Sequence, residues 1–422
     1  MAYYLTMKSK LQKLNFVLGS LIVSNSLNMV SAVADPYKPF TVKSAVPDQS
    51  LTKMFRSSSR WCGADGACTV PIDEDTTVWF FGDTFIKKDN RGATSKSKSI
   101  SKSKSKSGSE SKSGSEPKSK SNNSDADTAS SFDFINNTVA VQKLKSQKVD
   151  FFWRNINGQR WPVLIPKTVG NKSYYWPGDG FVLDEKLFVA SKVIVPRPVK
   201  FPGDFGFEWK SDDILQITNA GETPTKWQWK GIALPEHKRT ALMGTALLLK
   251  DDFAYFYSSL QKFARGPAVH PTGVARIPQR ALLAMDMSKF EFWNGQKWVP
   301  DIDQASIIFE DGASEMTVTE VAGEPYLVTT YMAPMSSDIC MRFARKPEGP
   351  WSDPIKVYQC PEHLEVVLGR RTAVYSAKAH PEFSHHKDEI VVSYCPNPGE
   401  MKHYLARPDL YYPRIIRVTL KK

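Results

Sequence analysis

Five stretches of the chain share one pattern: an apolar run, a tight polar turn, and a second run that ends in aromatic residues. They begin at Ala64, Pro177, Met243, Ser314 and Tyr375, at intervals of 113, 66, 71 and 61 residues. Each stretch predicts a β-hairpin. A repeat of this length with several strands per unit is typical of β-propellers. We therefore predict an all-β fold, a five-bladed β-propeller, whose inner strands bring distant residues to one axis.

Positive charge is concentrated outside these repeats. The formal net charge is +12, of which residues 94–121 contribute +6 and residues 1–34 contribute +3, leaving +3 for the rest. A nucleic-acid-binding protein needs Lys and Arg clustered on its folded part. We therefore expect no nucleic-acid partner.

The N-terminus has the features of an export signal. Three lysines precede the apolar run Leu14–Val23, and Ala32-Val33-Ala34 offers a small-residue cleavage site. Ten residues are too few to span a bilayer, so we expect no stable membrane insertion. The sequence predicts a signal peptide over residues 1–34 and a secreted or periplasmic propeller domain over residues 35–422.

A low-complexity insertion interrupts the first predicted blade. Residues 94–131 are mostly alternating Ser and Lys, which are too polar to be buried. We expect a disordered loop there. A solvated loop and a functional segment that holds an anionic polymer or a membrane surface both fit this composition.

The outer strands are less distinct than the hairpins. We expect them at Ala281–Asp286, Ile355–Tyr358 and Ile415–Leu420. If the chain ends close the ring, the last of these lies beside a short strand near Phe40.

We expect the protein to be a monomer.

Two carboxylates in the first hairpin would face each other. If the turn is centred on Glu74, paired residue numbers sum to 148 and Asp65 lies opposite Asp83. Opposed side chains have Cβ atoms about 4.5–5.5 Å apart. Like charges at that distance raise the pKa of one group and give an acid beside a base, as glycoside hydrolysis requires. The alternative is that these are ordinary turn residues.

Other predicted inner strands carry polar groups at the equivalent position. Asp179 opens the second strand, Glu315 the fourth and His380 the fifth, while the third has Thr245. Turn formation, ion pairing and a structural histidine are the alternatives for each residue taken alone. Their shared position in the repeat indicates a common site.

Aromatic residues near this site would suit a sugar ring. Trp61, Tyr175 and Trp176 lie at the predicted pocket ends of the first two blades, although propeller strands are rich in aromatics generally. Arg371 would bind an anionic group or cap a loop.

The sequence implies no required cofactor and no metal ligand set. It contains no phosphate-binding glycine loop, no His pair with zinc spacing and no Gly-x-Ser-x-Gly motif. A structural Ca²⁺ ion in the central channel is compatible with its carboxylates. For the five cysteines, buried thiols and one or two disulfides both remain open: Cys62, Cys68, Cys340, Cys360 and Cys395.

Several segments resemble a bacterial family of five-bladed propellers. This family has been known as a domain of unknown function, is related to furanosidase-type glycoside hydrolases and includes endo-D-arabinanases. The segments that carry the resemblance are Gly63–Ala67, Trp79–Phe85, Asn136–Thr138, Trp176–Gly180, Tyr375–Pro381 and Tyr412–Val418.

The resemblance implies roles for these residues. Asp65 and Asp83 would act as acid and as base or nucleophile, Asp179 and Glu315 would tune pKa values or hold substrate, and Asn137 would lie in the substrate site. We therefore expect an exported glycoside hydrolase that uses a carboxylate pair to cleave a furanose-containing, arabinan-like polysaccharide. The alternative is a non-catalytic propeller that binds carbohydrate or a partner protein.

Overall fold

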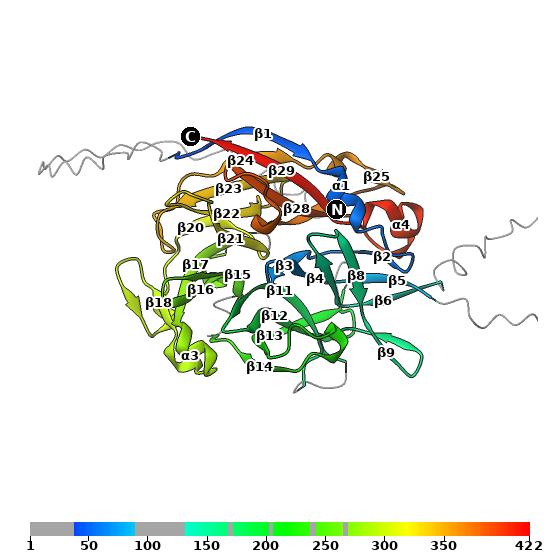
Figure 1. Ribbon diagram of the computed structural model, residues 1–422, viewed down its shortest axis with the longest axis horizontal. Coiled ribbons are helices and arrows are strands. Elements are labelled where there is room, and N and C mark those ends of the chain that lie inside the picture. Colours follow the sequence, from blue (N-terminus) through cyan, green and yellow to red (C-terminus); the bar gives the residue numbers. More distant parts are fainter. Residues whose placement is uncertain (1–37, 89–130, 168–171, 202–205, 237–241, 265–268) are drawn as a thin grey trace, which may run out of the picture. The chain divides into compact units, whose positions relative to one another are not determined.

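Antiparallel strands make up most of the described chain in this computed structural model (Figure 1). The structure describes residues 38–88, 131–167, 172–201, 206–236, 242–264 and 269–422. The predicted signal peptide and residues 94–130 of the insertion lie outside the described residues. No helix among the described residues is long and apolar enough to cross a membrane.

Among the described residues, five sheets contain four or more strands, and each follows the chain in order except where noted below. The first consists of β3 (Cys68–Pro71), β4 (Thr76–Phe81), β7 (Thr138–Lys143) and β8 (Lys148–Phe152). The second consists of β11 (Tyr174–Leu183), β12 (Lys186–Pro196), β13 (Phe207–Ile217) and β14 (Trp229–Ala233).

The third and fourth sheets continue this pattern. The third consists of β15 (Leu242–Lys250), β16 (Phe253–Ser259), β17 (His270–Pro278), β18 (Glu291–Trp293), β19 (Trp298–Val299) and β20 (Phe309–Gly312), the last paired with β17. The fourth consists of β21 (Met316–Glu320), β22 (Leu327–Met332), β23 (Asp338–Ala344) and β24 (Ile355–Gln359).

Both ends of the described chain build the fifth sheet. Its strands are β27 (Ala373–Ala379), β28 (Glu389–Asn397), β29 (Arg414–Lys421) and β1 (Thr41–Pro47). β1 pairs antiparallel with β29, Thr41 opposite Lys421. The predicted pairing of the last strand with a strand near Phe40 is therefore confirmed.

Smaller elements connect these sheets. A three-stranded sheet contains β2 (Trp61–Ala64), β5 (Thr84–Lys87) and β6 (Phe132–Ile135), and two hairpins are formed by β9 (Arg154–Ile156) with β10 (Gln159–Trp161) and by β25 (Val366–Val367) with β26 (Arg370–Arg371). The α-helices are α1 (Gln49–Met54), α3 (Gln279–Leu283) and α4 (Met401–Ala406). The 3₁₀ turns are Pro224–Lys226, Gln261–Phe263, Met287–Lys289, Ile302–Gln304, Pro361–Leu364, Pro381–Phe383 and Pro408–Leu410.

One predicted outer strand is wrong. Ala281–Asp286 lies in α3 and the turn that follows it. Ala281 and Leu282 are buried against the third sheet, in a cluster with Phe256 and Ile277. A short apolar run fits a buried helix turn as well as a strand, because its length hides the period.

The hydrophobic core lies between successive sheets. Separate clusters pack the first sheet on the second, the second on the third, the third on the fourth and the fourth on the fifth. A further cluster, with Trp79 and Phe81 from the first sheet and Val391 and Ile415 from the fifth, joins the last sheet to the first. Each sheet is thus buried on both faces by its two neighbours.

The first strands of the sheets meet one another. β11 packs against β3 and β15, β15 against β21, and β21 against β27. Thr69 of β3 hydrogen-bonds His380, which directly follows β27. In Figure 1, β3, β11, β15 and β21 gather in the middle of this unit, while β14, β18 and β1 lie toward its rim. Residues at the starts of these strands therefore come together.

Candidate carboxylate site

A break in the first hairpin places two carboxylates opposite each other. Ala64 pairs with Thr84 and Cys68 with Phe80, so paired residue numbers sum to 148 and the predicted register is confirmed. Between these pairs the ladder is interrupted where Gly66 takes a φ of 87°, a conformation that favours glycine. The backbone N–H of Asp65 donates to the carbonyl of Asp83 at 3.3 Å across this break.

The Asp65 carboxylate is held by two tyrosines. Its Oδ2 accepts hydrogen bonds from Tyr375 Oη at 2.7 Å and from Tyr411 Oη at 3.2 Å. Its Oδ1 lies over Gly82, where an added Cβ would come within 2.5 Å of it. Burial and then the charge of Asp83 raise the pKa of Asp65 to about 8. Asp65 is therefore protonated near neutral pH.

Asp83 is held from the other side. Its Oδ1 accepts hydrogen bonds from Trp176 Nε1 and Asn136 Nδ2, each at 3.1 Å. Burial raises the pKa of Asp83 to about 6, although these two hydrogen bonds oppose the rise. The pair thus carries one proton near neutral pH, which gives an acid beside a base.

Glu315 shares the site but ionises more readily. Its Oε1 lies 3.3 Å from Nζ of Lys378, a lysine with 2% side-chain exposure. Burial disfavours the charge on Glu315, but Lys378 and Lys192 outweigh it and lower its pKa. The charge of Glu315 in turn helps to raise the pKa of Asp65. Glu315 is therefore electrostatically coupled to the Asp65–Asp83 pair.

Asp179 joins two sheets. Its Oδ1 accepts from the backbone N–H of Gly180 at 2.9 Å and its Oδ2 from that of Leu247, on β15, at 2.7 Å. Burial raises the pKa of Asp179 to about 7. Because backbone groups engage both oxygens, Asp179 fixes the second sheet against the third.

The other predicted site residues divide into three groups. Trp176 contacts Asp83, whereas Trp61, Asn137, Tyr175 and His380 are almost completely buried. Their hydrogen bonds run to other parts of the protein: Trp61 to Thr138, Asn137 to Leu164 and Tyr175, Tyr175 to Asp213, and His380 to Thr69 and Ser393. Arg371 is exposed on β26.

The burial of Tyr175 has a simple cause. Successive side chains of a strand point to opposite faces, so Tyr175 points into the core when its neighbour Trp176 points to the site.

His380 is enclosed, and burial followed by the charge of Lys378 lowers its pKa to about 3. It is neutral near pH 7.

Sequence reasoning missed Tyr375, Tyr411 and Lys378 as site residues. Tyr375 and Lys378 fall inside the segment Tyr375–Pro381, which had already been singled out. A strict period-2 register puts Tyr375 and Lys378 on opposite faces, and the irregularity between them in β27, where Ser376 has a φ of 60°, is not visible in that pattern. Tyr411 gave no comparable signal, because it follows a short 3₁₀ turn whose direction the sequence does not reveal.

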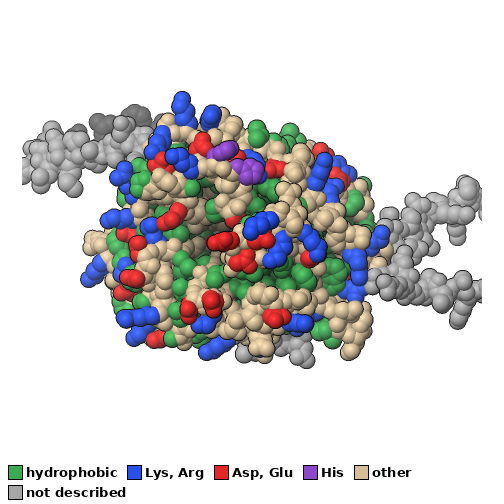
Figure 2. Space-filling view, viewed as in Figure 1, with side chains coloured by type: hydrophobic (Ala, Val, Ile, Leu, Met, Phe, Trp, Pro, Cys, Tyr) green, Lys and Arg blue, Asp and Glu red, His purple; other side chains and the backbone are tan. Residues whose placement is uncertain are grey.

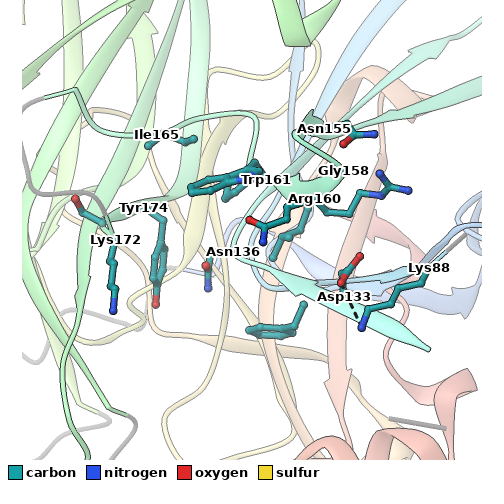
Figure 3. Close-up of a pocket in the computed structure, with 15 residues that line it drawn as sticks. Lys88, Asp133, Asn136, Asn155, Gly158, Arg160, Trp161, Ile165, Lys172 and Tyr174 are labelled. Carbon is teal, nitrogen blue, oxygen red and sulfur yellow. Dashed lines mark ion pairs between the residues drawn. The ribbon is translucent and has the colours of Figure 1, made fainter. Parts of the chain in front are cut away.

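A cavity of about 680 Å³, called here the cavity beside Asp83, is lined by Asn136, the hydrogen-bond partner of Asp83. It shares Asn136 with the site, and its lining includes Trp161 and Tyr174. Burial and then the charge of Asp83 raise the pKa of Tyr174. Figure 3 shows the ring of Trp161 across the cavity from Tyr174, with Asn136 below it. Asn136 therefore connects Asp83 of the carboxylate pair to a space large enough for a ligand.

Figure 2 shows one face of the protein with a hollow near its middle, bordered by acidic and basic side chains. Among the described residues, no group of three His, Cys, Asp or Glu side chains is arranged to hold a metal ion. All five cysteines are free thiols.

Comparison with solved structures identifies a similar fold. A protein of Bacteroides ovatus ATCC 8483, described as "a putative hydrolase", matches with a TM-score of 0.62 at 18% identity, over 89% of this chain and 90% of that chain. At this identity the likeness is one of fold alone. A search among curated proteins found no match.

Two further structures are more distant. A GH43 β-xylosidase/α-arabinofuranosidase from a compost microbial metagenome, in complex with xylotriose, has a TM-score of 0.42 at 13% identity, over 90% of this chain and 94% of that chain. A GH43_1 enzyme from Xanthomonas citri has a TM-score of 0.39 at 13% identity, over 88% and 93%. Scores this low assign neither fold nor activity to this chain.

A family sequence profile covers most of the chain. It matches residues 48–103 and 119–420, which include every strand of the five sheets except β1 and the final residue of β29. The chain therefore belongs to the family described as domain of unknown function DUF5005.

Proposed function

We propose that the protein is an exported glycoside hydrolase that cleaves a furanose-containing, arabinan-like polysaccharide. The five sheets, each packed on two neighbours, would be the blades of a five-bladed β-propeller with the carboxylate site on its axis. The furanosidase-like motifs support the substrate class, and the three lysines and apolar run near the N-terminus support export.

The observation that carries this proposal is the opposed placement of Asp65 and Asp83, two buried carboxyl groups whose pKa values are raised to different extents. Glycoside hydrolysis needs a protonated carboxyl group for the leaving oxygen and an ionised one for the anomeric carbon or a water molecule. Asp65 has the higher pKa and would be the acid, whereas Asp83 would be the base or nucleophile. The neighbouring cavity would hold the sugar.

Glu315 and Asp179 would support this pair. Glu315 stays ionised beside Lys378, and its negative charge favours the proton on Asp65. Asp179 would hold the second sheet against the third beside the site, through the hydrogen bond that it accepts from the backbone N–H of Leu247. Neither needs to touch the substrate in this mechanism.

The rival proposal is a non-catalytic propeller that binds carbohydrate in the same cavity. Trp161 and Tyr174 supply the aromatic surface and Asn136 the amide that such binding needs. It predicts binding without turnover, and binding that survives replacement of either carboxylate by its amide.

Product analysis separates the two. The chain from Asp35 onward would be incubated with arabinogalactan, plant arabinan and a panel of other glycans, with Asp65→Asn as the inactive control. We expect new oligosaccharides from the unmodified protein and a rate about 10²–10⁴-fold lower from the variant. Equal product from both proteins would remove Asp65 from catalysis. Binding without product from either would favour the rival.

A further inference from the structure

The cavity beside Asp83 has a predominantly basic lining. Lys88, Arg160 and Lys172 all face it. Among its described lining residues Asp133 is the one carboxylate, and it lies 3.7 Å from Nζ of Lys88. Figure 3 shows Lys88 and Asp133 on one side of the cavity and Lys172 beside Tyr174 on the other. An excess of positive charge therefore surrounds the space.

The same cavity offers groups that suit a sugar. The indole of Trp161 presents an aromatic face, and Asn136, Asn155 and Gln159 present amides. Amides pair with hydroxyl groups, whereas lysine and arginine pair most strongly with anionic oxygens. A neutral sugar would use the amides, whereas an anionic sugar would use both the amides and the cations.

A second basic cavity also has a lining residue from the β9–β10 hairpin. Its volume is about 520 Å³, and its described lining includes Arg154, Lys167 and Lys230 but no carboxylate. Arg154 and Lys167 lie 5.4 Å and 5.2 Å from the ring centre of Trp229, which also lines it. Cations over an aromatic face again combine attraction for negative charge with a surface for a ring.

One pair of residues connects the two cavities. Arg154 of β9 pairs in register with Trp161 of β10. Arg154 lines the cavity of about 520 Å³, and Trp161 lines the cavity beside Asp83. The β9–β10 hairpin thus contributes to two basic cavities. This arrangement fits a polymer with repeated negative charge better than a single charged molecule.

The carboxylates make such cations necessary for an anionic ligand. Asp83 is ionised near neutral pH and Glu315 carries a further charge, so a negatively charged sugar would be repelled from the pair. Basic groups in the adjacent cavity would offset that repulsion and raise the local concentration of an anionic substrate.

We propose that the cavity beside Asp83 is a subsite for an acidic sugar residue, a uronate, within the polysaccharide substrate. This inference rests on the proposed function, because it places the uronate next to the bond that Asp65 and Asp83 would cleave. A sugar phosphate presents the same negative charge, and the test must separate the two sources.

Binding to the Asp65→Asn protein would test the subsite without turnover. Glucose, glucuronate and glucose 6-phosphate would each be titrated and followed by NMR. We expect glucuronate to bind at least about tenfold more tightly than glucose, since charge-assisted hydrogen bonds are roughly twice as strong as neutral ones. That preference should weaken as salt is raised, because both lysines are exposed.

The variant Lys88→Gln/Lys172→Gln should weaken glucuronate binding about tenfold and leave glucose binding unchanged. Lys297→Gln, an exposed lysine in the turn between β18 and β19, is the matched control and should bind as the parent does. Equal affinity for glucose and glucuronate, or no effect of the double variant, would overturn the subsite. Tighter binding of glucose 6-phosphate than of glucuronate would overturn its assignment to a uronate.

This test can fail separately from the proposed function. If glucuronate binds as expected but no glycan is hydrolysed, the subsite stands and the hydrolase proposal fails. If neutral arabinan is hydrolysed at the same rate by the parent and the double variant, and glucuronate does not bind, the hydrolase proposal stands and the acidic subsite is wrong.

Discussion

Asp65 and Glu315, two acids of the carboxylate site, differ in the charge of the group beside them. Asp65 faces another carboxylate, and its pKa rises to about 8. Glu315 faces Lys378, and its pKa falls below the usual value although its surroundings also penalise charge. Burial alone would raise both pKa values. The comparison teaches that the partner decides which acid keeps its proton.

Removing Lys378, the positive partner of Glu315, should have the largest effect on this difference between the two acids. Lys378→Met removes the partner in contact with Glu315 and leaves the weaker attraction of Lys192, so we expect the free energy of unfolding to fall by about 1.5–3 kcal/mol. Urea unfolding at pH 7 measures the loss. The double variant Lys378→Met/Glu315→Gln should recover most of it. If the single variant is as stable as the parent, the ion pair does not stabilise the fold.

The pH dependence of hydrolysis should show both acids of the pair. Asp83 must lose its proton and Asp65 must keep its own, so kcat/KM should rise with pH to about 6 and fall above about 8. Beyond each limit we expect about a tenfold loss per pH unit. Initial rates between pH 4 and pH 10 provide the profile. A rate that continues to rise above pH 8 would remove the acid role from Asp65.

Gly82 allows the close approach of the Asp65 carboxylate. In Gly82→Ala the new methyl group would displace Oδ1 of Asp65, and we expect a fall in kcat of about fivefold with little change in KM. Gly221→Ala is the matched control, since nothing lies within 4 Å of its added Cβ. Equal kcat in the two variants would mean that the position of Oδ1 is unimportant.

A last effect should appear in the pH dependence of stability. The pKa of Asp65 is about 8 in the folded protein, well above the usual 3.8, so its ionisation opposes folding. The cost is absent below about pH 4 and is complete above about pH 8. Asp65→Asn should therefore match the parent at pH 4 and have the higher free energy of unfolding at pH 8.5. A variant that is less stable at pH 8.5 would contradict the raised pKa.

The sequence predicted the parts of the fold that depend on local alternation. Hairpin positions and the register of Asp65 against Asp83 follow from period-2 patterns and turn residues. The pairing of β1 with β29 was expected only from closure of the ring by the chain ends. Ala281–Asp286 was wrong because a run of six residues does not distinguish a buried helix turn from a strand.

The site itself was harder to predict. Asp65 and Asp83 meet through local pairing, whereas Lys378 and Tyr411 reach the site through contacts between distant sheets. Residues of the β9–β10 hairpin line the cavity, and the Asn157-Gly158 turn of this hairpin is a strong hairpin signal in the sequence. Trp176 and Tyr175 show that an aromatic pair in one strand supplies only one residue to a given face.

The pairing of β1 with β29 has a consequence for how the protein is made. The fifth sheet joins one of the first described strands to the last one, so it cannot be completed until residue 421 has been synthesised. Until then β28 exposes an unpaired edge, which favours association with other chains. Deleting Arg414–Lys421 would thus leave an open-edged, aggregation-prone chain at any stage of synthesis.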